Sequence, residues 1–223
     1  MVQPMDKGYF DKLAKTILDG DKDGCVRLIN EGLNKGVDPL EAVEKGLAKG
    51  IKQVGDDFGA GRSFLPELIM AADTMQEGFK VLDERIKVQG KSRKTLGKVV
   101  IGTVKGDIHN IGKSVVASVL QANGYDVVDI GIDVDDDKFV EGVTKYNADC
   151  VAMSSLLTLT IQGMGRVVQK LKTAGLRDKV KVIVGGAPVT QEFADEIGAD
   201  AFGFDAADAV KKMAILLGGK AHK

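Results

Sequence analysis

The residues best suited to chemistry stand together near the middle of the chain. Asp107 and His109 follow an apolar run that is typical of a β-strand, and Gly112 comes three residues later. An imidazole nitrogen is a common metal ligand, and a carboxylate on the other ring nitrogen fixes the tautomer and raises the basicity of the ligand. The pattern therefore predicts a histidine ligand oriented by Asp107, although an isolated aspartate–histidine pair is more often structural.

Two further motifs follow at fixed separations. Ser154-Ser155-Leu156 comes after the spacer of residues 113–153, and Gly185-Gly186 comes after residues 157–184. Each motif has an ordinary explanation by itself, since a glycine pair before Ala187-Pro188 is typical of a strand-to-helix turn. The three motifs at these separations form a combination far rarer than any one of them.

Hydrophobic periodicity divides the chain into two parts. From Tyr9 to about Val88, apolar residues recur every three or four positions, which predicts about four helices with breaks near residues 20–21, 36–39 and 59–61. From Lys98 onward, short apolar strands alternate with amphipathic helices. The expected strands are 99–104, 126–130, 149–153, 181–184 and 201–204, and the expected helices are 111–123, 136–146, 160–174, 190–197 and 206–217.

These patterns predict an α/β protein in which an N-terminal four-helix bundle precedes a flavodoxin-like or Rossmann-like, doubly wound, five-stranded parallel sheet. We expect a helical cap domain over residues 1–90, a linker over 91–97 and the sheet domain over 98–223. Ligands of such sheets bind beyond the carboxyl ends of the strands. With a strand order of 2-1-3-4-5, the loop of His109 would face Ser154 across a cleft.

Composition narrows the class of protein without naming its function. The net charge of −1 and the pI near 6.2 give no basic surface for nucleic acid or for an anionic membrane. Charged residues interrupt every apolar run among the first twenty residues, which argues against a signal peptide and for a cytoplasmic protein. The two cysteines are too few and too distant for a disulfide framework or a zinc cluster.

The complete set of D-x-H-x-x-G, S-x-L and G-G motifs resembles the cobalamin-binding module of methionine synthase and its relatives. Residues 54–58, 61–67 and 71–75 look like the helical cap that precedes that module. The two-domain format is similar to that of the free-standing corrinoid proteins of methanogens and acetogens, whose methyltransferase systems use methylamines, quaternary amines, methanol or aryl methyl ethers. Quaternary amines and methylamines fit the overall resemblance best.

The resemblance assigns roles to individual residues. It implies that His109 is the lower axial ligand of cobalt, with Asp107 as its partner and Thr160 in the place of a serine that continues the relay in methionine synthase. Residues around the slot for the cofactor's nucleotide would be Gly112, Ser154, Leu156, Thr158, Val184, Gly185 and Gly186. Cap residues over the upper face of the corrin would be Phe64, Leu68, Met70 and Met75, although such side chains are more often core.

The resemblance also implies a methyl carrier of one-carbon metabolism, in methanogenesis or acetogenesis, rather than an enzyme with its own substrate site. A partner methyltransferase would methylate Co(I), and methyl-Co(III) would serve a second methyltransferase acting on coenzyme M or tetrahydrofolate, with a reductive activase as a third partner. Alternatives are an adenosylcobalamin-dependent mutase subunit, a cobalamin-based light sensor and a cobalamin-free flavodoxin-like module. The helical cap argues against the mutase, the lack of tryptophan against the sensor, and the motif spacing against the flavodoxin-like module.

Overall fold

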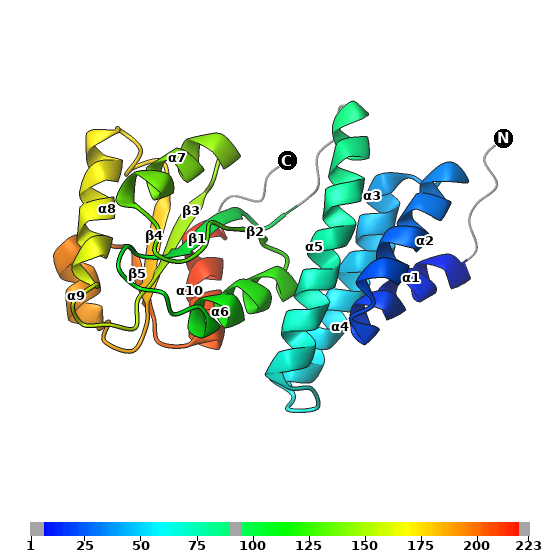
Figure 1. Cartoon of the computed structure of the whole chain (residues 1–223), viewed down its shortest axis with the longest axis horizontal. Coiled ribbons are helices and arrows are strands. Elements are labelled where there is room, and N and C mark those ends of the chain that lie inside the picture. Colours follow the sequence, from blue (N-terminus) through cyan, green and yellow to red (C-terminus); the bar gives the residue numbers. More distant parts are fainter. Residues whose placement is uncertain (1–6, 90–94, 219–223) are drawn as a thin grey trace. The chain divides into compact units, whose positions relative to one another are not determined.

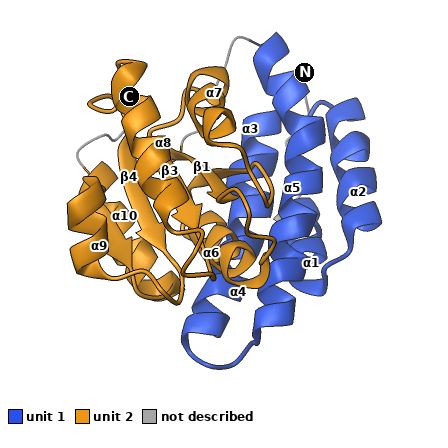
Figure 2. Cartoon of the chain, turned by 60° about the vertical axis from the view of Figure 1, so that its left-hand side comes forward, with its two compact units in different colours: residues 1–94 blue, residues 95–223 orange. Residues whose placement is uncertain are grey.

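The chain folds into a helical part and an α/β part (Figure 1). The computed structural model describes residues 7–89 and 95–218. Residues 1–94 form one compact unit, here called the helical unit, and residues 95–223 form a second, called the sheet unit (Figure 2). The predicted linker over 91–97 lies partly outside the described residues. Thr95 and Leu96 belong to the sheet unit, since both donate hydrogen bonds to the carbonyl of Gly124 at 3.1 Å.

Four helical rods make up the described part of the helical unit. They are α1 (Lys7–Asp19), α2 (Lys22–Asn34), a continuous run of α3 (Pro39–Glu41), η1 (Ala42–Leu47) and α4 (Ala48–Gly59), and α5 (Leu65–Val88). Asp38 accepts a hydrogen bond from the backbone N–H of Leu40, and Pro39 occupies the first helical position, as the sequence predicts. The segment η1 is a π-helix inside the third rod, which the sequence pattern does not predict.

The core of the helical unit lies between these rods. The longest helix, α5, buries a stripe at helical spacing that includes Leu68, Met75, Phe79, Leu82 and Ile86. The stripe packs on apolar side chains of the other three rods, among them Leu13, Ile17, Ile29 and Leu47. Burial of this stripe fixes which face of α5 remains available to solvent.

The sheet unit is a parallel α/β fold with five strands in the order β2-β1-β3-β4-β5 among the described residues. Its elements are β1 (Lys98–Thr103), α6 (Ile111–Ala122), β2 (Asp126–Asp129), α7 (Asp136–Tyr146), β3 (Cys150–Ser154), α8 (Gln162–Thr173), β4 (Lys181–Gly185), α9 (Gln191–Ile197), β5 (Ala201–Gly203) and α10 (Ala206–Leu217). This order confirms the predicted topology. β1 and β3 are neighbours, with Thr103 paired to Ser154, so the loops that follow them start side by side.

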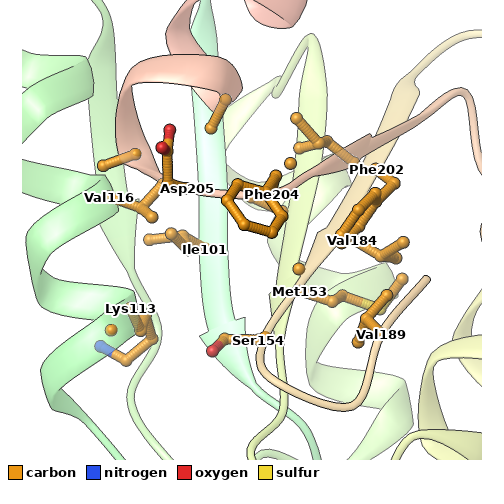
Figure 3. Close-up of a pocket in the computed structure, with 18 of the residues that line it drawn as sticks. Ile101, Lys113, Val116, Met153, Ser154, Val184, Val189, Phe202, Phe204 and Asp205 are labelled. Atoms are coloured by element: carbon orange, nitrogen blue, oxygen red, sulfur yellow. The ribbon is translucent and has the colours of Figure 1, made fainter. Parts of the chain in front are cut away.

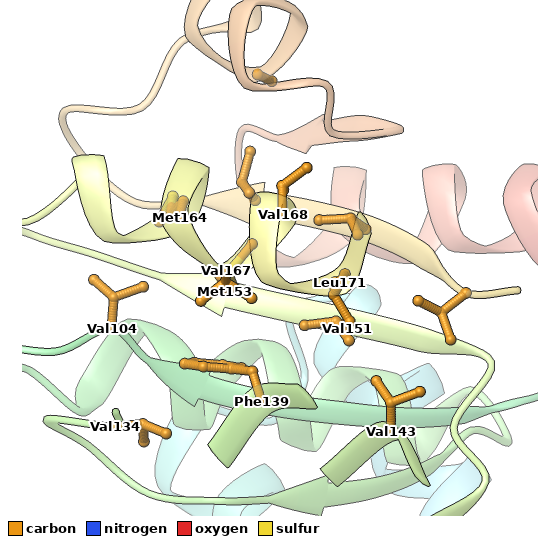
Figure 4. Packing of buried hydrophobic residues seen from close by; sticks show 14 of the residues in the cluster. Val104, Val134, Phe139, Val143, Val151, Met153, Met164, Val167, Val168 and Leu171 are labelled. Carbon is orange, nitrogen blue, oxygen red and sulfur yellow. The ribbon is translucent and has the colours of Figure 1, made fainter. Parts of the chain in front are cut away.

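Helices cover both faces of the sheet. One face is packed by α7, α8 and α9 over a dense apolar cluster that includes Phe139, Met164 and Leu171 (Figure 4). The other face is covered by α6 and α10 over a cluster that includes Leu120, Ala152, Ile183 and Met213. Two buried layers hold the strands rigidly, and the loops at their carboxyl ends can therefore present side chains in fixed positions.

Candidate functional site

His109 and Asp107 form the expected pair on the loop between β1 and α6. The Nδ1 atom of His109 lies 2.7 Å from Oδ1 of Asp107, and the backbone N–H of His109 donates to the same oxygen at 3.0 Å. An ionised carboxylate only accepts hydrogen bonds, so Nδ1 carries the proton and Nε2 presents its lone pair. The imidazole side chain is 46% exposed while the Asp107 side chain is fully buried, so the orientation of the ring is fixed and its exposed edge could bind a metal.

The second oxygen of Asp107 ties this loop to the loop that follows β3. Oδ2 accepts from the backbone N–H groups of Leu156 at 2.6 Å and Leu157 at 3.1 Å. The hydroxyls of Ser155 and Thr160 also lie within reach of Oδ2, at 3.1 and 3.2 Å, and 2.7 Å from each other. Burial would raise the pKa of Asp107, but the hydrogen bonds, led by those of the backbone N–H groups, hold this pKa well below its ordinary value.

A third loop braces the His109 loop from the side of β2. Asp133 has a left-handed backbone, with φ +51°, and its Oδ1 accepts from the N–H of Gly106 at 2.8 Å. The N–H of Asp133 donates to the carbonyl of Asp107 at 2.9 Å, and the hydroxyl of Thr103 donates to the carbonyl of His109 at 2.9 Å. The backbone on either side of the imidazole is thus fixed by neighbouring strands and loops.

A cavity of about 330 Å³ lies between the sheet and the helices α6 and α10 (Figure 3). Five residues predicted to surround a nucleotide slot line it, namely Gly112, Ser154, Val184, Gly185 and Gly186. Gly186 has φ +127°, and a Cβ there would lie 1.8 Å from the carbonyl oxygen of Ser155, so only glycine allows the two loops this approach. A Cβ on Gly112 would meet nothing within 4 Å, so the chain itself leaves room for a larger residue at this lining position.

Lys113 is the most deeply buried charged residue that lines the cavity. It is 2% exposed, in the first turn of α6, and its ammonium pairs with the carboxylate of Asp129 at the end of β2. The other oxygen of Asp129 accepts from the N–H of Gly131 at 2.8 Å. This ion pair therefore fastens the start of α6, next to His109, to the edge strand.

The remaining predicted residues have other surroundings. Leu156 and Thr158 are exposed and do not line the cavity, so the contribution of Leu156 to the site is its backbone N–H. In the helical unit, Phe64 and Met70 are exposed, whereas Leu68 and Met75 are buried in the bundle core. Phe64 and Met70 are thus the two of the four whose side chains are exposed.

Several large apolar side chains are exposed in the loops and helix start at the carboxyl edge of the sheet. They are Ile108, Ile111, Ile132, Leu156, Leu157, Leu159 and Phe204. Exposed apolar side chains along one edge of a sheet are typical of a surface that binds a partly apolar molecule.

The fold and the site define a class of protein: a helical domain joined to a parallel α/β domain that presents one histidine and an apolar slot at its carboxyl edge. A family model described as a B12 binding domain matches residues 97–214, and a second B12 binding domain model matches residues 9–83. The chain therefore belongs to the family of B12-binding corrinoid proteins.

Relatives with long alignments support the assignment. The chain is 46% identical to the trimethylamine corrinoid protein of Methanosarcina barkeri, over 91% of this chain and 93% of the relative. It is 46% identical to dimethylamine corrinoid protein 1 of Methanosarcina mazei, over 94% and 96%. The structure of the methanol:cobalamin methyltransferase complex of Methanosarcina barkeri matches with a TM-score of 0.81 and 32% identity, covering 100% of this chain and 87% of that one.

The site also fits a corrinoid on geometric grounds. A single imidazole suits a metal whose other coordination positions are already filled, and the apolar cavity next to it suits an aromatic side group of the cofactor. No helix among the described residues has the length and hydrophobicity required to cross a lipid bilayer.

Proposed function

We propose that this chain is the methyl-carrying corrinoid subunit of a methylamine methyltransferase system. The relatives are named as trimethylamine and dimethylamine corrinoid proteins, which supports methylamines as the methyl source. A bound corrinoid would supply a cobalt centre that takes up and gives up a methyl group. The protein would hold this cofactor and offer it in turn to two methyltransferases, one specific for the methylamine and one acting on coenzyme M or tetrahydrofolate, while a reductive activase restores the reduced cofactor.

The observation that supports the proposal best is the contact between His109 and Asp107. Because Nδ1 donates to a buried carboxylate, Nε2 would be the atom that binds cobalt. Ser155 and Thr160, within hydrogen-bond reach of the other carboxylate oxygen, would complete a relay that adjusts how strongly the imidazole is polarised. The chain's own part in methyl transfer would thus be control of ligand strength.

The cavity beside the site would receive the nucleotide of the cofactor. If His109 binds cobalt, the cofactor's own base would need a separate place, and the cavity would supply it. Gly112 and Gly186 would let the nucleotide backbone pass close to the main chain, Ser154 would meet the base, and the positive end of α6 would lie near its phosphate. On the helical unit, Phe64 and Met70 are the two candidates whose side chains are exposed.

The test is a spectroscopic titration of the purified apoprotein with hydroxocobalamin. We expect stoichiometric binding by the wild type, by His109→Ala and by Thr173→Ala, an exposed control on α8 whose hydroxyl reaches only the carbonyl of Gln169. The spectral change due to histidine ligation should be absent only in His109→Ala and should return with added imidazole. Binding without any difference between the variants would contradict the histidine-ligand proposal, and failure of the wild type to bind would contradict the whole proposal.

A second measurement tests the carrier role. The reduced, cofactor-loaded protein is mixed with each methylamine in the presence or absence of the matching methyltransferase, and methylation is followed by absorbance. Methylation that requires one particular methyltransferase would identify the donor. Methylation at equal rates without any partner protein would contradict the proposed division of labour.

A further inference from the structure

Asp133, in the loop after β2, has a left-handed backbone. Its φ is +51°, and Asn147 is the other residue besides glycine with a positive φ in the part of the chain that the structure describes. Asn147 follows α7 as its C-terminal cap, which is a common place for this conformation. Asp133 instead lies between β2 and Asp135, the N-terminal cap of α7. A strained residue in such a loop persists where the surrounding contacts hold it.

Two contacts hold Asp133, and both of them reach the loop that carries His109. The carboxylate atom Oδ1 of Asp133 accepts from the backbone N–H of Gly106 at 2.8 Å, and the N–H of Asp133 donates to the carbonyl of Asp107 at 2.9 Å. Asp107 is thereby anchored twice, since Asp133 holds its main chain and the loop after β3 holds its carboxylate. The contact of 2.7 Å between the imidazole and this carboxylate depends on both anchors.

Gly106 is the point at which the His109 loop has the most freedom to turn. Its φ is +85°, and a hydrogen bond on its N–H restricts a bend that no side chain of its own restricts. Farther along, the loop is fastened by the buried ion pair of Lys113 with Asp129, at the end of β2. Asp133 and Asp129 therefore hold the segment that carries the imidazole at its two ends.

Hydrogen bonding, rather than ion pairing, accounts for this role of Asp133. The ammonium of Lys105 lies 3.4 Å from Oδ1 of Asp133 and 3.3 Å from Oδ1 of Asp135. All three side chains are between 45% and 64% exposed, and ion pairs between such exposed groups contribute little. A backbone N–H that donates to a carboxylate forms a stronger, charge-assisted hydrogen bond. Asp135 thus shares the lysine with Asp133, whereas the bond to Gly106 belongs to Asp133.

We propose that Asp133 is a positioning residue for His109. It fixes the backbone of Gly106 and Asp107 so that the imidazole keeps Nδ1 on the carboxylate and Nε2 available to a metal. The inference rests on the proposed function, in which Nε2 binds cobalt. It goes further in assigning the strength of that bond to a residue from a third loop, which touches neither the metal nor the imidazole.

The first test uses NMR spectroscopy of the full-length apoprotein, because it reads the imidazole without a metal. The chain has two histidines, so a His222→Gln background leaves His109 as the one imidazole. At a pH at which this ring is neutral, nitrogen–proton correlations show which nitrogen carries the proton. We expect the Nδ1–H form in this reference protein and a rise of about threefold or more in the Nε2–H fraction in Asp133→Gly, which loses a charge-assisted hydrogen bond. An unchanged ratio of tautomers would overturn the inference.

Three variants separate the hydrogen bond from the charge. Asp133→Gly removes only the carboxylate, because glycine adopts a φ of +51° without strain and keeps the N–H that donates to Asp107. Asp133→Asn retains an oxygen that accepts from Gly106 and tolerates the same backbone, so it should keep the tautomer ratio of the reference. Asp135→Gly is the matched control, since it removes a carboxylate from Lys105 and should leave the ratio unchanged. A shift in Asp133→Asn or Asp135→Gly as large as that in Asp133→Gly would overturn the positioning role.

A second readout uses the protein loaded with hydroxocobalamin. Free imidazole competes with His109 for cobalt, so its apparent dissociation constant should fall by about threefold or more in Asp133→Gly and stay unchanged in Asp135→Gly. A residue that merely stabilises the fold would lower the midpoint of urea unfolding and leave the tautomer ratio and this competition unchanged, which would overturn the inference. Failure of the reference protein to bind hydroxocobalamin would contradict the proposed function, while the tautomer ratio would still decide whether Asp133 positions His109.

Discussion

Replacing Gly112 by alanine should separate protein stability from cofactor binding. Gly112 is the second residue of α6, outside the left-handed backbone region, and a Cβ at this position would touch nothing within 4 Å. Glycine has more conformational freedom than alanine in the unfolded chain. The free energy of unfolding of the apoprotein should therefore rise by about 0.4–1 kcal/mol.

The same methyl group should impair binding of the corrinoid. Gly112 lines the cavity, so under the proposed function the added Cβ would take up space that the nucleotide needs. Overfilling a close-fitting site costs about 1–3 kcal/mol, which raises the dissociation constant by about 5- to 150-fold. Urea unfolding of the apoprotein measures the first effect, and absorbance titration with cobalamin measures the second.

Gly59→Ala is the control for this variant. Gly59 is the last residue of α4, and a Cβ there would also meet nothing within 4 Å. The free energy of unfolding of Gly59→Ala should therefore rise as that of Gly112→Ala does, while its affinity for cobalamin stays unchanged. Unchanged cobalamin affinity in Gly112→Ala would refute the assignment of the cavity to the nucleotide. A loss of stability in the apoprotein would refute the description of Gly112 as an unstrained helical residue.

Three variants and one chemical probe test other parts of the sheet unit. In urea melts, Gly186→Ala should lower the free energy of unfolding by about 3 kcal/mol or more, because it combines left-handed backbone strain with a clash against the carbonyl of Ser155. A loss below about 1 kcal/mol would contradict the close approach of Gly186 to Ser155. In the same assay, Asp129→Asn should lower the free energy of unfolding by about 3–5 kcal/mol, because it leaves the buried Lys113 unpaired. Lys113→Met should lower it by less than about 1.5 kcal/mol, because Asp129 is 39% exposed and can be solvated. Equal losses in the two variants would refute this asymmetry. Burial raises the pKa of the Cys150 thiol, so iodoacetamide at pH 8 should modify it only after unfolding, as mass spectrometry of the alkylated peptide would show.

The α/β fold could be predicted because local and long-range signals agree. Each strand is a short apolar run and each helix has one apolar face, so the predicted helix over 136–146 coincides with α7, and β1, predicted as 99–104, is observed at Lys98–Thr103. The position of the site follows from the general rule for parallel sheets, which places the loops after β1 and β3 together. The π-helix Ala42–Leu47 could not be predicted, because the same residues are compatible with one continuous α-helix from Pro39 to Gly59.

The candidate site was predicted less completely than the fold. The hydroxyl of Thr160 lies 3.2 Å from Oδ2 of Asp107, but the sequence assigned no role to Ser155, whose hydroxyl is within reach of both. The signal for Ser155 was its place in the Ser154-Ser155-Leu156 motif, one residue past the end of β3. The backbone N–H groups of Leu156 and Leu157 could not be predicted at all, since any residue except proline supplies such a donor. Side-chain types therefore indicated the pair of His109 and Asp107, whereas the structure reveals the hydrogen bonds that fix it.

This fixation explains why the sheet register matters to the chemistry of the site. One buried carboxylate joins the loop after β1, through His109, to the loop after β3, through two backbone N–H groups and two hydroxyls. The pairing of Thr103 with Ser154 sets the distance between these loops. Gly186, which has no Cβ, allows the loop after β4 to approach the backbone of Ser155 closely. Because the carboxylate already accepts several hydrogen bonds, the loss of one donor would shift its orientation less than the loss of the register. The imidazole is thus positioned by the whole carboxyl edge of the sheet rather than by Asp107 alone.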